Sequence, residues 1–220
     1  MNALLLYPHF PRTFWSFDRF LEMAGVKAFI PPLGILTVAS LLPPHWNPRF
    51  HDRNVVEEPE DDWHWCDLVI LSAMLVQRED FHHLIRQAVA MGKKVAVGGP
   101  CPTSLPKHAL QSGAHYLILD EGEITVPAFL AALERGEPCG VFRALEKPDV
   151  SLSPRPRYDL LQRDADLMMA VQFPRGCPFN CEFCDIISRN CRPSTTWAGG
   201  DPSSWWMTTS SAISTTSGVC

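Results

Sequence analysis

The sequence lacks the features that mark several large classes of protein. Its formal net charge is −5, so it has no basic excess, and this argues against a nucleic-acid partner. No apolar run approaches the roughly 20 residues that a membrane-spanning helix needs. The N-terminal segment has no basic region, and its apolar run ends after four residues, so it does not resemble a secretory signal. We therefore expect a cytoplasmic protein with no membrane span, in which cysteines stay reduced.

Glycine-rich nucleotide motifs are absent as well. No predicted strand is followed by G-x-G-x-x-G, and the P-loop pattern G-x-x-x-x-G-K-[ST] does not occur. The composition, 46% hydrophobic and 20% charged, is that of a globular protein with enough apolar material for a core. Of the eight cysteines, Cys66, Cys101 and Cys139 are isolated in sequence, and we expect ordinary thiols there.

Short apolar runs alternate with helical patterns up to about residue 140. Apolar runs of this length are typical of buried parallel strands, and the helical segments repeat apolar residues at helical spacing. The alternation predicts a doubly wound α/β domain with a mostly parallel sheet over residues 1–146. The predicted strands are Ala3–Tyr7, Arg49–Val55, Asp67–Leu71, Lys94–Val97 and Tyr116–Leu119. The predicted helices are Ile35–Leu42, Arg78–Met91, Leu105–Gln111 and Glu123–Arg135, and His9–Lys27 is predicted as a loop or short helix.

Ligands of such sheets bind beyond the carboxyl ends of the strands. These ends fall at Tyr7-Pro8, Ser72-Ala73, Gly98-Gly99-Pro100 and Asp120-Glu121-Gly122. Structural explanations of the same residues remain open. Gly98 and Gly99 can form a tight turn, Ser72 can cap a helix, and Glu121 and Glu123 can be first-turn acids that the helix dipole favours.

Three closely spaced cysteines form the most specific motif. Residues 147–166 are rich in proline and serine and predict an extended linker, and the apolar run Leu167–Phe173 predicts the first strand of a second domain. Cys177, Cys181 and Cys184 follow with the spacing C-x3-C-x2-C. Three such thiolates can hold a four-iron cluster and leave one iron open to a ligand. The alternative is a zinc knuckle with Cys191 as fourth ligand.

This motif, with an aromatic residue before its third cysteine, resembles that of the radical S-adenosylmethionine (radical SAM) superfamily. The resemblance implies that Cys177, Cys181 and Cys184 ligate a 4Fe-4S cluster, and that residues 167–190 begin a partial (βα)6 barrel. It also implies that the open iron binds S-adenosylmethionine, with Phe183 near the adenine, and that an external electron donor reduces the cluster. The implied chemistry is reductive cleavage to a 5′-deoxyadenosyl radical, which abstracts hydrogen from a small-molecule substrate that the sequence does not identify.

The N-terminal part is similar to the cobalamin-binding class of that superfamily, in which a Rossmann-like domain precedes the cysteine motif. The resemblance implies cobalamin-assisted methyl transfer or another C–H functionalisation. The chain departs from many cobalamin domains because it lacks Asp-x-His-x-x-Gly, whose histidine ligates cobalt. The alternatives are a cobalamin-binding module without catalysis and a small zinc-binding protein. The residues implied to contact cobalamin are Tyr7, Pro8, Leu33, Gly34, Ser72, Ala73, Gly98, Gly99, Pro100, Glu121 and Gly122.

Residues 191–220 differ in composition from the rest. From Ser194 to Cys220, 13 of 27 residues are Ser or Thr, Asp201 is the one charged side chain, and no pattern would form a core. Trp205-Trp206-Met207 fixes the codons TGG TGG ATG, and a shifted frame permits Leu-Val-Asp-Asp-Asn-Phe-Ile-Gly, which resembles the same family. We expect an out-of-frame tail, the alternative being a disordered native one. A barrel needs roughly 180 residues after its cysteine loop, so we expect a truncated chain that is inactive alone.

Overall fold

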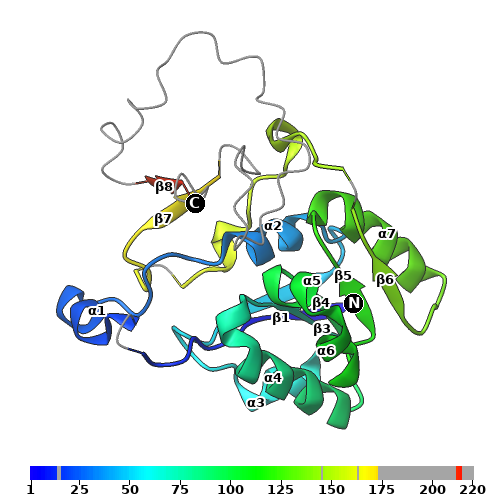
Figure 1. The fold of residues 1–220 in the computed structure, drawn as a ribbon, viewed down its shortest axis with the longest axis horizontal. Coiled ribbons are helices and arrows are strands. Elements are labelled where there is room, and N and C mark those ends of the chain that lie inside the picture. Colours follow the sequence, from blue (N-terminus) through cyan, green and yellow to red (C-terminus); the bar gives the residue numbers. More distant parts are fainter. Residues whose placement is uncertain (14–15, 145, 163, 173–211, 215–220) are drawn as a thin grey trace.

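The computed structural model describes residues 1–13, 16–144, 146–162, 164–172 and 212–214. Its main body is a six-stranded parallel sheet in the order β2-β1-β3-β4-β5-β6 (Figure 1). The strands are β1 (Asn2–Tyr7), β2 (Asn47–Asp52), β3 (Leu68–Ser72), β4 (Lys94–Gly98), β5 (Tyr116–Ile118) and β6 (Gly140–Phe142). The helices are α1 (Asp18–Ala24), α2 (Leu33–Leu41), α3 (Glu60–Trp65), α4 (Arg78–Ala90), α5 (Pro100–Ser104), α6 (Pro106–Gln111) and α7 (Gly122–Glu134), with short 3-10 turns η2 (Leu75–Gln77), η3 (Val150–Leu152) and η4 (Tyr158–Leu160).

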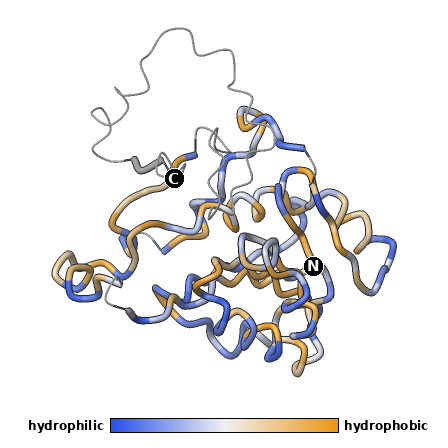
Figure 2. The backbone as a smooth tube through the Cα atoms, in the orientation of Figure 1, coloured by the Kyte–Doolittle hydropathy of each residue, from blue (hydrophilic) through white to orange (hydrophobic). Residues whose placement is uncertain are grey.

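The central strands are continuously apolar because helices cover both faces of the sheet. In β1, Leu4 and Leu6 belong to the core under α3, α4, α5 and α6, whereas Ala3 and Leu5 belong to the core under α2 and α7. Alternation of side chains along a strand sends successive residues to opposite cores. Figure 2 shows the hydrophobic residues concentrated along these strands and the hydrophilic ones along the outer helices and loops. The predicted doubly wound, Rossmann-like α/β class is therefore confirmed.

Several predicted elements need correction at their bounds, and some were missed. The weak strand predicted at Arg49–Val55 is β2, which begins two residues earlier and ends at Asp52. α1 lies within the segment predicted as a loop or short helix. The sequence pattern did not predict α3, α5 or β6, each of which has six residues or fewer. Elements this short contain too few residues to display a period.

The segment predicted as a linker contains the 3-10 turns η3 and η4, and its described part lies against the domain. We call residues 153–162 and 164–168 the strap. Leu160 packs against the core under α2 and α7. The chain then continues into β7 (Met169–Val171), a shorter form of the predicted strand Leu167–Phe173. Hydrogen bonds to the strap include one from the Ser40 side chain, whose Oγ donates to Arg155 O at 2.7 Å. Backbone bonds include Arg157 N to Leu36 O at 3.1 Å and Ala28 N to Ala165 O at 3.1 Å.

β7 pairs in parallel with β8 (Ala212–Ser214) in a separate two-stranded sheet. The predicted start of a barrel and the predicted out-of-frame tail otherwise fall on residues outside the described ranges, and both stay predictions. Among the residues that the structure does describe, no helix has the length and hydrophobicity needed to cross a bilayer.

Candidate functional site

The direction in which strands are added to the sheet reverses between β1 and β3. In parallel sheets such a reversal opens a crevice beyond the carboxyl ends of the two strands, and ligands bind there. The structure brings the residues implied to contact cobalamin to this edge, which we call the carboxyl edge. Those at or just beyond strand ends are Tyr7 and Pro8 at β1, Ser72 and Ala73 at β3, and Gly98 and Gly99 at β4. Those at helix starts are Leu33 and Gly34 at α2, Pro100 at α5, and Glu121 and Gly122 at α7.

Gly98 and Gly99 allow the end of β4 to lie directly against its neighbours. A Cβ atom on Gly99 would lie 2.7 Å from Ser72 Oγ and 3.2 Å from the backbone N and O of Ala73, and one on Gly98 would lie 3.0 Å from Ile118 O. Gly99 also has a φ of 88°, in the left-handed region that favours glycine. The tight-turn interpretation is therefore confirmed for Gly99, and the two glycines add no side chains of their own to this part of the edge.

Gln77 connects the ends of β1 and β3, and sequence reasoning missed it. Its side chain is 1% exposed; Nε2 donates to Pro8 O at 2.5 Å, and Oε1 accepts from the Met74 backbone N–H at 2.7 Å. It also bonds to Tyr7, whose phenol pKa is raised by burial and secondarily by the charge of Asp52. The available signal was a glutamine next to Leu75-Val76, since a buried amide must find partners.

An acidic turn follows β5. Asp120 has a φ of 66°, its N–H donates to Thr103 Oγ1 at 3.2 Å, and its carboxylate accepts from Arg143 Nε at 3.1 Å. Glu121 is 9% exposed and forms an ion pair with Lys147. Glu123 lies in the first turn of α7. This placement agrees with the first-turn interpretation for Glu123, whereas Glu121 is the N-cap residue of α7.

Ser72 does not cap a helix, because η2 begins beyond it with Met74 in the capping position. Its hydroxyl instead lies where β3 and β4 end side by side, in register with Gly98. The alternative explanation of Ser72 as a helix cap is therefore wrong, and its hydroxyl remains a candidate ligand contact.

The predicted iron–sulfur residues Cys177, Cys181, Cys184 and Phe183, and the alternative zinc ligand Cys191, lie outside the described residues. Within the described part, no three side chains of His, Cys, Asp or Glu gather as a metal site. Cys66 and Cys101 are buried free thiols, and Cys139 is an exposed one, as predicted. Burial raises the pKa of the Cys66 and Cys101 thiols, so both are weak nucleophiles.

Comparison with known proteins agrees with this geometry. A family model described as the B12 binding domain matches residues 21–130, half of the chain. The chain is 57% identical over 187 residues to an uncharacterized methyltransferase of Synechocystis sp., covering 85% of this chain and 35% of that protein.

Two further relatives also have names of methyl-transferring enzymes. Identity is 33% to the hopanoid C-2 methylase of Rhodopseudomonas palustris, over 88% of this chain and 38% of that protein. It is 25% to the bacteriochlorophyllide d C-12(1)-methyltransferase of Chlorobaculum tepidum, over 74% of this chain and 36% of that protein. The chain thus spans little more than a third of the length of these relatives. On the family match, the chain belongs to the B12-binding domain family.

Proposed function

We propose that the chain binds cobalamin at the carboxyl edge and serves a methyl-transfer reaction. The main support is the coincidence of two observations: the B12-binding match includes the ends of β3, β4 and β5, and these ends lie on the carboxyl edge, where β3 borders the strand reversal. The names of the relatives support methyl transfer as the reaction class. Bound cobalamin would supply a cobalt centre that accepts and donates a methyl group.

The residues at this edge fit a corrinoid, which has a broad ring and many peripheral amides. No atom lies within 4 Å of a Cβ built on Gly34, so the space there is open. Met74, two residues after Ser72, is 44% exposed and offers apolar surface. The turn at Gly98 and Gly99 lets a ligand approach the backbone. We therefore assign the holding of the corrinoid to the eleven residues that gather at this edge.

We further propose that Cys177, Cys181 and Cys184 hold a 4Fe-4S cluster and that Phe183 lies beside the adenine of S-adenosylmethionine. The support is the C-x3-C-x2-C spacing directly after β7. Cluster and S-adenosylmethionine together would supply the radical that activates an unreactive carbon of a small molecule. An external donor would supply the electron.

Anaerobic reconstitution of the full chain with iron, sulfide and hydroxocobalamin tests both parts. We expect bound corrinoid together with an iron–sulfur absorbance band, on the order of 400 nm for such clusters. Cys177→Ala should lose the band and keep the corrinoid. Cys139→Ala is the matched control, because Cys139 is an exposed free thiol of the described domain, and it should keep both.

The other outcomes separate the alternatives. Corrinoid without iron in the wild-type chain would contradict the cluster and leave a cobalamin-binding module. Stoichiometric zinc without corrinoid would favour the small zinc protein. If wild type binds neither corrinoid nor metal, both proposals fail.

A further inference from the structure

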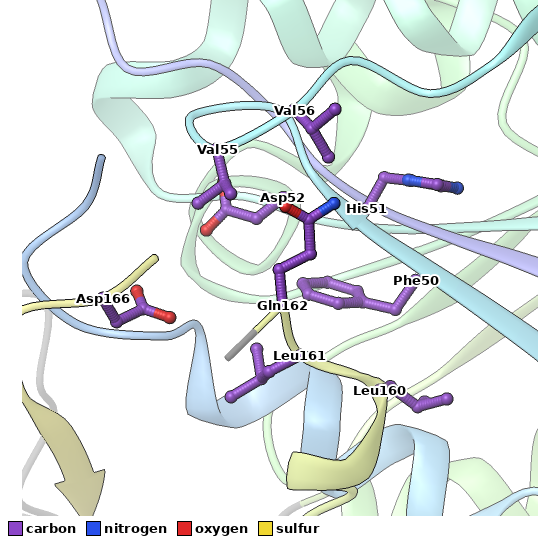
Figure 3. A pocket seen from close by; sticks show the side chains of 9 residues that line it. All are labelled: Phe50, His51, Asp52, Val55, Val56, Leu160, Leu161, Gln162 and Asp166. Carbon is purple, nitrogen blue, oxygen red and sulfur yellow. The ribbon is translucent and has the colours of Figure 1, made fainter. Parts of the chain in front are cut away.

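A small hollow separates the end of β2 from the strap, on the outer side of the carboxyl edge (Figure 3). Most of its lining is apolar, yet two carboxylates from distant parts of the chain face it, Asp52 at the end of β2 and Asp166 on the strap. Two ionised carboxylates in an apolar hollow repel each other strongly. The protonation of Asp52 and Asp166 therefore affects whether the end of β2 and the strap stay in contact. The lining residues are Phe50, His51, Asp52, Val55, Val56, Leu160, Leu161, Gln162 and Asp166.

The backbone on either side of Asp166 is fixed to the segment before α2. Asp166 forms a parallel β-bridge with Ala28, and its neighbours complete the bridge: Ala28 N donates to Ala165 O at 3.1 Å, and Leu167 N donates to Ala28 O at 2.9 Å. These bonds fix the position of the Asp166 backbone beside the hollow. Its Oδ1 atom is buried and has no hydrogen-bond partner.

The two carboxylates are not equivalent. Asp52 is 6% exposed, but its Oδ1 accepts two bonds from Asn54, one from the backbone N at 2.9 Å and one from Nδ2 at 2.7 Å. Burial raises the pKa of Asp52, and these bonds oppose the rise. Burial, and secondarily the charge of Asp52, raise the pKa of Asp166 to about 6. Asp166 is therefore the carboxyl that takes up a proton first.

Other charged groups face the same region from each neighbouring element. His51 lines the hollow, but its Nε2 bonds to Asp62 Oδ2 at 2.6 Å. Lys27 Nζ donates to Val55 O at 3.0 Å. On the β1 side, His9 acts on Asp52, and Tyr7 stays neutral because its pKa is raised.

We propose that Asp166 is a proton-dependent latch that holds the strap to the end of β2 when protonated and weakens that contact when ionised. The raised pKa fixes the direction: docking is favoured while Asp166 is protonated and is progressively lost as pH rises through about 6. Because β7 begins directly after the strap, the latch would control how firmly β7 is held to the B12-binding domain. The inference needs no cofactor and does not depend on the proposed function.

Hydrogen exchange in the full chain, in metal-free buffer without cofactor, tests the latch. The readout is protection of the Leu167 and Met168 amides, which bond to Ala28 O and Phe29 O, corrected for intrinsic rates. In wild type we expect protection to fall by about tenfold between pH 5 and 7.5. Asp166→Asn should remain protected at both values.

Asp164→Asn is the matched control, because Asp164 is an exposed carboxylate on the same strap with a φ of 70° that asparagine tolerates. It should follow wild type. An identical pH dependence in wild type and Asp166→Asn would overturn the proposal, because the effect would then belong to another group. Carboxyl NMR gives a second test in unmodified protein: titration of Asp166 at an ordinary value of about 4 would also overturn it.

Discussion

At the scale of single residues, Gly99 is the position where the backbone of the proposed site tolerates least change. We expect Gly99→Ala to lower the free energy of unfolding by about 2 kcal/mol, because its φ of 88° strains any other residue and the new Cβ would collide with Ser72. Gly34→Ala is the control: its Cβ meets open space in the first turn of α2, so stability should stay level or rise by up to about 1 kcal/mol. Urea denaturation measures both, and equal losses would contradict the difference.

Gln77 is the second residue on which the edge depends. Gln77→Met leaves the Met74 N–H without its buried partner and leaves Pro8 O with its bond from Asn54 Nδ2 at 3.1 Å, and we expect a loss of about 1–2 kcal/mol. Gln111→Met, at an exposed helix end, should change stability by less than about 0.5 kcal/mol. The same denaturation assay compares them, and a neutral Gln77→Met would mean that water replaces the amide without cost.

At the scale of elements, Tyr158 fastens the strap to β7. Its hydroxyl donates to Ala170 O at 2.7 Å, so Tyr158→Phe removes one bond, worth about 1 kcal/mol. We expect faster amide exchange in β7 and unchanged exchange in β1 and β3. Ser151→Ala, which removes only a local bond to Asp149, should leave β7 as in wild type. Equal exchange in the two variants would show that the Tyr158 bond does not hold β7.

Strands buried on both faces could be predicted from sequence, whereas α3, α5 and β6 could not. β1, β3 and β4 are apolar throughout because two helical layers cover them, and this makes them recognisable without neighbours. β6 has three residues with Val141 54% exposed at the sheet margin, and α3 is a single short helix that packs through Trp63. Their stability comes from tertiary packing, which no local pattern encodes.

The site divides in the same way. Strand ends, glycines and the turn after β5 could be located from sequence because parallel topology places all carboxyl ends at one edge. The hydrogen bonds by which Gln77 connects the ends of β1 and β3 could not be predicted. The approach of Asp166 to Asp52 could not be predicted either. Both depend on contacts between segments far apart in the chain, and a single sequence contains no information about such pairing.

At the scale of the whole molecule, one sheet edge serves two purposes. Its inner part, at the reversal between β1 and β3, forms the proposed corrinoid surface. Its outer part, at the end of β2, receives the strap that leads to β7. The B12-binding domain therefore positions both the proposed cofactor and the segment that precedes the cysteine motif.

The most direct test of the proposed site is equilibrium binding of hydroxocobalamin to two variants of the full chain. One variant is obstructed at the carboxyl edge, and the other at the opposite end of α7. Gly34→Trp places a bulky side chain on the carboxyl edge, and Glu134→Trp places one at the exposed opposite end of α7. We expect wild type and Glu134→Trp to bind corrinoid alike, and Gly34→Trp to bind about tenfold more weakly or worse, a loss of about 1.4 kcal/mol. Equal affinity in both variants, or no binding by wild type, would contradict a cobalamin site at the carboxyl edge.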